Sequence, residues 1–195
     1  GTQILEDLND LAHLMRNVRV QDWLLESWVR FERELALVVS RDRQGRIRHL
    51  PMVETHQSNQ ICDWVLAPAE AEPLLEATAY NIAASLLTRL GYVGVMALEF
   101  FYGPDGLFVN EIAPRTHNSG HFSIEACSSS QFDQQLCITA GLPVPATELV
   151  VEGALMVNLL GLQDAAAVGN DQNLNERLAR LRSFPNAHVH WYGKQ

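Results

Sequence analysis

The sequence is short of cysteine, of basic residues and of long apolar runs, and each shortage excludes a class of protein. Its three cysteines, Cys62, Cys127 and Cys137, show no CxxC spacing, which favours a reduced, cytoplasmic chain over a disulfide-framed secreted one. With 14 Lys and Arg against 23 Asp and Glu, the net charge is −9. This balance argues against nucleic acid or an anionic membrane as the main partner. No apolar run approaches the roughly 18 residues of a membrane span.

The composition is that of a folded chain. Hydrophobic residues make up 47% and charged residues 19% of the 195 positions, which excludes disorder, collagen and coiled coil. The length suits one domain, or one and a half small ones. The chain begins at Gly1 without an initiator Met or a signal peptide and closes on Gly193-Lys194-Gln195. We therefore expect it to be a piece of a longer protein.

Hydrophobic periodicity predicts an α+β fold with largely antiparallel pairing, because the helices and strands do not alternate as in a Rossmann fold. Leu142-Pro143-Val144-Pro145 is the best linker candidate, which divides the chain into domains 1–145 and 146–195. Helices are predicted over 4–16, 70–90 and, in two pieces, 122–140. Strands are predicted over 22–29, 34–41, 46–54, 93–102, 107–113, 153–161 and 187–192, with a loop and a short strand over 55–68 and polar material before 187.

Two glutamates stand out inside apolar strands. Glu99 lies in Leu-Glu-Phe-Phe and Glu111 in Asn-Glu-Ile-Ala. A three-residue hairpin loop, Pro104 to Gly106, would place them directly opposite each other, with Cβ atoms about 5 Å apart. Opposed like charges destabilise a sheet unless a hard cation with oxygen ligands neutralises them. A four-residue loop would instead place Glu99 opposite Asn110, and both carboxylates could simply face solvent.

Polar residues are concentrated in the turn after the second strand. Arg115, His117, Asn118, Ser119, Gly120 and His121 fall within seven positions. Glycine lets backbone approach a ligand closely, the N–H groups that start a helix can bind an anion, and arginine can fork onto phosphate or carboxylate. An ordinary capped polar loop is the alternative. The two histidines at i, i+4 could also bind zinc, but no third ligand stands at a suitable spacing.

These motifs resemble one family. The run Asn110-Glu-Ile-Ala-Pro-Arg-Thr-His-Asn-Ser-Gly-His121, followed by Ser130-Gln131-Phe132, is similar to N5-carboxyaminoimidazole ribonucleotide synthetases of the ATP-grasp superfamily. Glu26-Ser-Trp-Val-x-Phe-x-x-Glu34 resembles the family's adenosine-binding strand and hinge. His190-Trp191-Tyr192-Gly193-Lys194 resembles the start of its C-terminal phosphate motif. The sister formate-dependent glycinamide ribonucleotide transformylases usually have His-Asp-Thr-Gly in place of His-Asn-Ser-Gly.

The resemblance implies the C-terminal part of an ATP-grasp domain followed by a small, β-rich C-terminal subdomain. Gly1 would then fall inside the glycine-rich loop, so that the N-terminal domain and the phosphate-binding lysines lie outside this sequence. We expect this piece alone to be inactive and the full-length protein to be a homodimer.

The resemblance also implies a reaction: ATP, bicarbonate and 5-aminoimidazole ribonucleotide give the N5-carboxy product, ADP and phosphate, with Mg²⁺ as cofactor. Its residue roles carry over by position. The metal would be held by Glu99 and Glu111. The nucleotide would be bound by Glu26, Trp28, Val29, Glu34 and Asn110. The bicarbonate and carboxyphosphate site would be lined by Arg115, His117, Asn118 and Ser119, and substrate would be contacted by Lys194 together with Arg115 and Asn118.

Departures and alternatives remain beside this interpretation. Many ATP-grasp enzymes carry an asparagine metal ligand at the position of Ala113, although alanine is usual there in the family that this sequence resembles. Thr55-His56-Gln57 replaces an Asn-x-His stretch, and Gln135 and Cys137 replace a His and an Arg. Glu26 and Glu34 could be surface charges, and Lys194 a solvated tail. The competing functions are another ATP-grasp ligase or transformylase, and a non-catalytic ATP-grasp-like dimerisation module.

Overall fold

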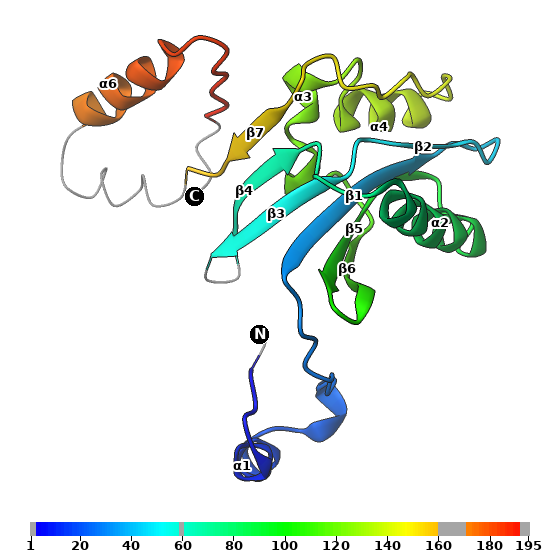
Figure 1. The fold of residues 1–195 in the computed structure, drawn as a ribbon, viewed down its shortest axis with the longest axis vertical. Helices are drawn as coiled ribbons and strands as arrows, with labels where there is room; N and C mark the ends of the chain where they lie inside the picture. The colour runs from blue at the N-terminus through cyan, green and yellow to red at the C-terminus, as the bar shows by residue number, and fades with distance from the viewer. Residues whose placement is uncertain (1–2, 59–60, 160–170, 192–195) are drawn as a thin grey trace.

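The computed structural model describes residues 3–58, 61–159 and 171–191, and within them one antiparallel sheet organises the molecule (Figure 1). Its strand order is β6-β5-β1-β3-β4-β7, and β2 pairs with the far end of β1. The α+β class predicted from sequence is confirmed. The strands are β1 (Arg33–Arg41), β2 (Ile47–His49), β3 (Val53–Ser58), β4 (Ile61–Ala67), β5 (Gly94–Gly103), β6 (Gly106–Ala113) and β7 (Ala154–Val157).

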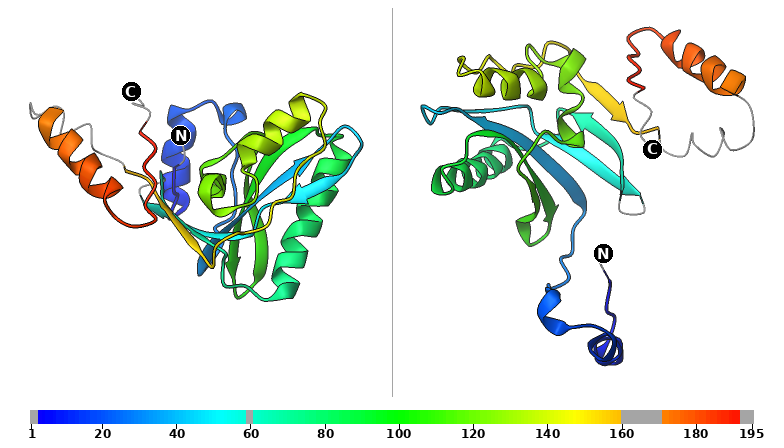
Figure 2. Two further views of the ribbon diagram at one scale, coloured as in Figure 1. Left: turned by 90° about the horizontal axis from the view of Figure 1, so that it is seen from above. Right: turned by 180° about the vertical axis from the view of Figure 1, so that it is seen from behind.

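Helices cover the two faces of the sheet separately (Figure 2). Helix α2 (Pro73–Arg89) packs Ala79, Ala83 and Leu87 on one face. The other face carries the 3-10 turn η2 (Asn118–Gly120), α3 (Ser123–Ala126) and α4 (Gln131–Thr139). Because side chains alternate along a strand, β1 contributes to the hydrophobic cores on both faces of the sheet. Its side chains Leu35, Leu37 and Val39 face α2, whereas Ala36 and Val38 face α3.

The β5–β6 hairpin differs from the predicted one and still opposes the two glutamates. Its loop has two residues, Pro104 and Asp105, between the paired Gly103 and Gly106. The register then shifts by one residue beyond Phe100, so that Asn110 forms a bulge and Glu99 pairs with Glu111. In an unbroken ladder Asn110 would take that place, and Glu111 would point to the other face. The predicted pair is confirmed, but the predicted three-residue loop is wrong.

Several other predicted boundaries are wrong as well. Residues 23–31 form no ladder, so the strand predicted over 22–29 is absent, and the 3-10 turn η1 (Val20–Asp22) precedes this stretch. The segment 46–54 is divided between β2 and β3, and the fully buried Leu50 lies between the two strands. The stretch 55–68, predicted as a loop and a short strand, contains the end of β3 and the whole of β4.

The C-terminal part also differs from expectation. Strand β7 covers only Ala154–Val157 of the strand predicted over 153–161, and 160–170 lie outside the described residues. Helix α6 (Asp171–Arg182) replaces the predicted polar connection, since Arg and Leu repeat there at helical spacing. Residues 187–191 form no strand, and 192–195 lie outside the described residues.

The N-terminal segment extends away from the sheet (Figure 1). Its helix α1 (Leu8–Asn17) lies close to the predicted 4–16 and buries no residue. Asp7 is its N-cap, and the Asp7 carboxylate accepts hydrogen bonds from the backbone N–H groups of Asn9 and Asp10. The segment rejoins the sheet at Phe31, which stacks on Phe101 with ring centroids 4.3 Å apart. Among the described residues, no helix is long and apolar enough to cross a membrane.

Candidate active site

Three carboxylates gather on the face of the sheet that carries α3. Glu99 and Glu111 are cross-strand partners, and Glu34 lies two residues along β1 from Ala36, the other neighbour of Glu99. All three side chains therefore leave the sheet on the same face. The side chain of Glu99 is 17% exposed, whereas Glu111 is exposed. The sheet thus places one largely buried carboxylate beside two others.

This crowding changes the protonation of the buried members. Burial, together with the negative charges of Glu111 and Glu34, raises the pKa of Glu99 to about 7. Burial also raises the pKa of Glu34, although a hydrogen bond from the backbone of Gln57 and the nearby His56 oppose the shift. Both the burial and the neighbouring negative charges disfavour an ionised Glu99. A bound cation would offset these negative charges, so the group suits a cation.

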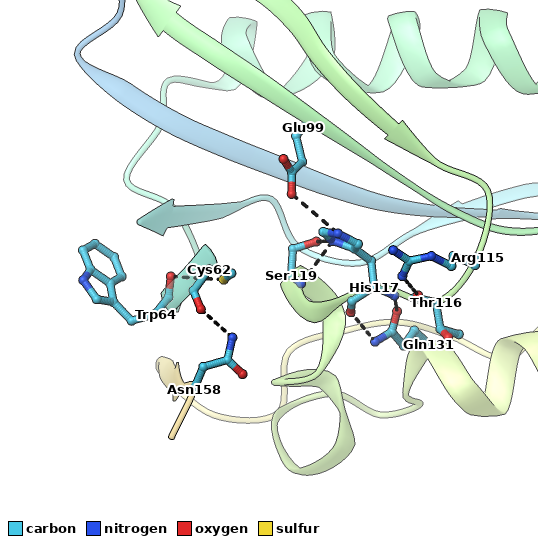
Figure 3. Close-up of polar contacts among 9 residues, drawn as sticks. All are labelled: Cys62, Trp64, Glu99, Arg115, Thr116, His117, Ser119, Gln131 and Asn158. Carbon is cyan, nitrogen blue, oxygen red and sulfur yellow. Dashed lines mark hydrogen bonds and ion pairs between the residues drawn. The ribbon is translucent and has the colours of Figure 1, made fainter. Parts of the chain in front are cut away.

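The loop after β6 brings His117 to Glu99 (Figure 3). His117 Nε2 lies 3.6 Å from Glu99 Oε1, with both side chains mostly buried. On the other side of the ring, Ser119 N–H donates to His117 Nδ1 over 3.4 Å, and Ser119 Oγ lies 3.0 Å from the same nitrogen. Since Nδ1 accepts, the hydrogen of the neutral ring is on Nε2, which faces Glu99.

His117 is therefore a capping residue as well as a neighbour of the carboxylates. It is the N-cap of η2, which its side chain stabilises by accepting from Ser119. Burial lowers the pKa of His117, and the positive charge of Arg115 lowers it further, while Glu111 opposes both. The lowered pKa favours the neutral ring, whose Nδ1 accepts from Ser119 N–H.

The remaining predicted loop residues line the same turn. Arg115 is exposed, and its guanidinium donates to the carbonyl of Thr116 over 2.9 Å. Its other N–H groups have no hydrogen-bond partner within 3–58, 61–159 and 171–191. Asn118 is half-buried at the start of η2, and Ser119 is buried. Arg115, His117, Asn118 and Ser119 thus share one turn, and His117 is the residue of it that reaches Glu99.

One residue of this site was assigned no role from the sequence. Gln131, the first residue of α4, is fully buried and bonds to both backbone groups of His117. Gly120 makes room for it: a Cβ at that position would lie 2.6 Å from Gln131 Oε1. The sequence suggested a close approach of Gly120 to a ligand, whereas the structure shows a close approach to this side chain. The motif Ser130-Gln131-Phe132 was the available signal.

Other predicted site residues lie apart from this cluster or outside the described residues. Glu26 and Trp28 are exposed, and Val29 half-buried, in the N-terminal segment before β1. Asn110, the bulge residue, is exposed. Lys194 lies outside the described residues. The described part of the chain contains no group of three or more His, Cys, Asp or Glu that could hold a metal by itself, so a metal at Glu99 and Glu111 would need oxygen ligands from elsewhere.

Comparison with known proteins identifies the class. The ATP-grasp domain model matches residues 1–132, and the phosphoribosylaminoimidazole carboxylase C-terminal domain model matches residues 154–195. The chain belongs to the ATP-grasp family. Within it, the chain is 45% identical over 194 residues to N5-carboxyaminoimidazole ribonucleotide synthase of Synechococcus elongatus, a match covering 100% of this chain and 48% of that protein. The chain spans about half the length of the curated relatives it matches at full coverage.

Solved structures agree with this placement. The N5-carboxyaminoimidazole ribonucleotide synthetase of Thermus thermophilus superposes with a TM-score of 0.76 at 38% identity, covering 87% of this chain and 44% of that one. The N5-carboxyaminoimidazole synthase of Aspergillus clavatus, solved with ADP and 5-aminoimidazole ribonucleotide, has a TM-score of 0.63 at 35% identity over 72% of this chain and 40% of that one. The resemblance drawn from the sequence motifs is confirmed.

Proposed function

We propose that the protein of which this chain forms part is an ATP-dependent carbon–nitrogen ligase of purine biosynthesis. It would carboxylate 5-aminoimidazole ribonucleotide with bicarbonate, and release ADP and phosphate. The observation that carries the proposal is the placement of His117 against Glu99 on a loop that also holds Arg115, Asn118 and Ser119. A relative crystallised with ADP and 5-aminoimidazole ribonucleotide supports the substrate class.

The carboxylate pair fits a magnesium ion carried by the nucleotide. Glu99 and Glu111 are oxygen donors, and burial raises the pKa of Glu99 to about 7, so the metal-free site holds a proton where a cation would be more favourable. These two residues would hold the ion. When bound, magnesium would neutralise charge on the triphosphate and in the transition state.

The chemistry needs an anion site next to the nucleotide. Bicarbonate is a poor electrophile; when its oxygen attacks the γ-phosphorus of ATP, a P–O bond of ATP breaks and carboxyphosphate and ADP form. The amino nitrogen then attacks the carbon of carboxyphosphate, or of CO2 released from it; phosphate leaves and the nitrogen loses a proton. Arg115 would hold the anion through the N–H groups that do not bond to Thr116. Neutral His117 would cap η2 and so hold the loop next to Glu99.

Further roles follow from the family. Glu34 would contact the ribose hydroxyls, and Glu26, Trp28, Val29 and Asn110 would contribute to the nucleotide site once the rest of the parent protein is present. Lys194 would approach the phosphate of the ribonucleotide. We also infer a division into domains 1–145 and 146–195, a homodimeric parent, and a cytoplasmic location, which the three free cysteines support.

The test is ADP release by the full-length parent. With 5-aminoimidazole ribonucleotide and bicarbonate, we expect turnover that depends on both. Turnover with glycinamide ribonucleotide and formate instead would move the protein to the transformylases. No turnover with either substrate pair would favour the non-catalytic dimerisation module and contradict the proposal.

A further inference from the structure

Gln131 is a buried side chain with every polar atom bonded to the loop of the candidate active site. Its Oε1 accepts from His117 N–H over 2.9 Å, and its Nε2 donates to His117 C=O over 2.7 Å. The same Nε2 lies 2.9 Å from His121 Nδ1. One side chain on α4 therefore contacts two histidines of the preceding loop, and Figure 3 shows its bonds to His117.

The backbone fixes which way the carboxamide of Gln131 points. A backbone N–H only donates and a backbone C=O only accepts. If the amide were reversed, its NH2 group would face the N–H of His117 and its oxygen would face the C=O, and both hydrogen bonds would be lost in a fully buried place. The oxygen must therefore face His117 N, and the nitrogen must face His117 O.

This orientation determines the tautomer of His121. The NH2 group has two hydrogens: one goes to His117 C=O, and the other points at His121 Nδ1. Nδ1 must then be an acceptor, so the hydrogen of the neutral ring is on Nε2. Burial lowers the pKa of His121, and His117 and His190 lower it further, which favours this neutral state. The ring also stacks on Phe132, with centroids 5.6 Å apart.

The surroundings of Gln131 show that the place is shaped for it. Its backbone N–H donates to Ser123 Oγ over 3.0 Å, and that hydroxyl donates in turn to Gly120 C=O. Gly120 lies so close that a Cβ there would stand 2.6 Å from Gln131 Oε1. The start of α4 and the loop are thus joined on both sides of the side chain.

We propose that Gln131 is a positioning residue that holds the His117–His121 loop to α4 and fixes His121 as the Nε2–H tautomer. His121 thereby becomes a neutral hydrogen-bond donor of one defined geometry within the site. The effect on turnover rests on the proposed function, whereas the tautomer and the loop geometry do not.

The first test is the tautomer itself, by ¹⁵N NMR of the histidine rings in the 195-residue chain, with the His121 signals assigned from His121→Gln. We expect an unprotonated Nδ1 and a protonated Nε2. A protonated Nδ1 on His121 in the unmutated chain would overturn the proposal.

The second test compares two buried glutamines on the same helix. Gln134 is also fully buried, but neither polar atom of its side chain has a hydrogen-bond partner among the described residues. Gln131→Met should perturb the ring signals of both His117 and His121, whereas Gln134→Met, which makes the same change of side chain, should leave them in place. If both variants shift the ring signals of His117 and His121 equally, the effect comes from side-chain packing and not from the hydrogen bonds of Gln131, which contradicts the proposal.

The third test uses turnover of the full-length parent. Gln131→Met should lower kcat by about 100-fold, the scale expected for a misplaced catalytic loop, while KM for ATP stays unchanged and Gln134→Met retains activity. If the tautomer is as proposed but the unmutated parent turns over neither substrate pair, the proposed function fails and the assignment of Gln131 to the loop stands. A parent that is active and insensitive to Gln131→Met would overturn the positioning role.

Discussion

The carboxylate of Glu99 lies 3.6 Å from the imidazole of His117, although one residue belongs to an inner strand of the sheet and the other to the loop after its edge strand. Glu111 completes the group from the opposite position of the hairpin. A carboxylate pair suited to a cation and a loop suited to an anion therefore meet at one place. This contact is the structural basis of the proposed chemistry, and it leads to several measurable consequences.

Replacing Glu99 by Gln should stabilise the metal-free chain at high pH. The pKa of Glu99 rises from its usual 4.5 to about 7 in the folded state. The folded state thus binds a proton more tightly than the unfolded one, so this group's contribution is most favourable below pH 4.5 and falls as pH rises to about 7. At pH 8 we expect Glu99→Gln to raise the free energy of unfolding by on the order of 3 kcal/mol.

The control for this prediction is pH. At about pH 4 the native Glu99 is protonated and resembles Gln, so denaturant titrations of the two proteins should nearly coincide there. A stabilisation of equal size at low and high pH would show that packing, and not charge, is responsible.

Glu111→Gln in the full-length parent should weaken the response to magnesium. Removing one of two carboxylate ligands lowers the affinity for a hard cation, and we expect the Mg²⁺ concentration for half-maximal ADP release to rise by roughly tenfold or more. Asp105→Asn is the matched control, since it removes an exposed carboxylate at the turn of the same hairpin. Equal shifts from both variants would point to general electrostatics instead of ligation.

Gly120→Ala should destabilise the chain through a collision with one side chain. The new Cβ would stand 2.6 Å from Gln131 Oε1, and overpacking of this kind costs about 1–3 kcal/mol. In a Gln131→Ala background the collision is removed, so the same substitution should cost much less. If its cost is the same in both backgrounds, the close approach of the two residues is not the cause.

Ser130→Ala should weaken the start of α4. Ser130 Oγ accepts from the backbone N–H of Asp133, whose carboxylate accepts from the N–H of Ser130 in return. Loss of such a cap costs about 1 kcal/mol. Because the two halves act together, Ser130→Ala combined with Asp133→Ala should cost less than the sum of the single changes. Strict additivity in thermal unfolding would argue against the capping box.

The sequence predicted those features of the site that depend on local pattern. An acidic residue inside each of two apolar strands, followed by a polar turn, pointed to Glu99, Glu111 and the loop from Arg115 to Ser119, and the structure places Glu111 opposite Glu99 and His117 of the loop 3.6 Å from Glu99. The helix over 70–90 was predicted close to its observed bounds because Pro73 and Gly91 mark its ends.

The features that the sequence missed depend on contacts between distant residues. The bulge at Asn110 brings Glu111 to the face of Glu99, and no local sequence pattern reveals it. Residues 23–31 have the apolar content of a strand but no partner strand among the described residues, so they form no ladder. Gln131 bonds to residues 10 and 14 positions earlier, and no local sequence pattern predicts such contacts.

The central claim is that bicarbonate is activated by phosphoryl transfer in this site, and oxygen labelling tests it most directly. The full-length parent would be given ¹⁸O-bicarbonate, ATP and 5-aminoimidazole ribonucleotide, and the released phosphate analysed by mass spectrometry. If carboxyphosphate forms, its C–O bond breaks when phosphate leaves, so each phosphate should carry one oxygen from bicarbonate. Phosphate without label, under conditions where the carboxylated product accumulates, would contradict the account.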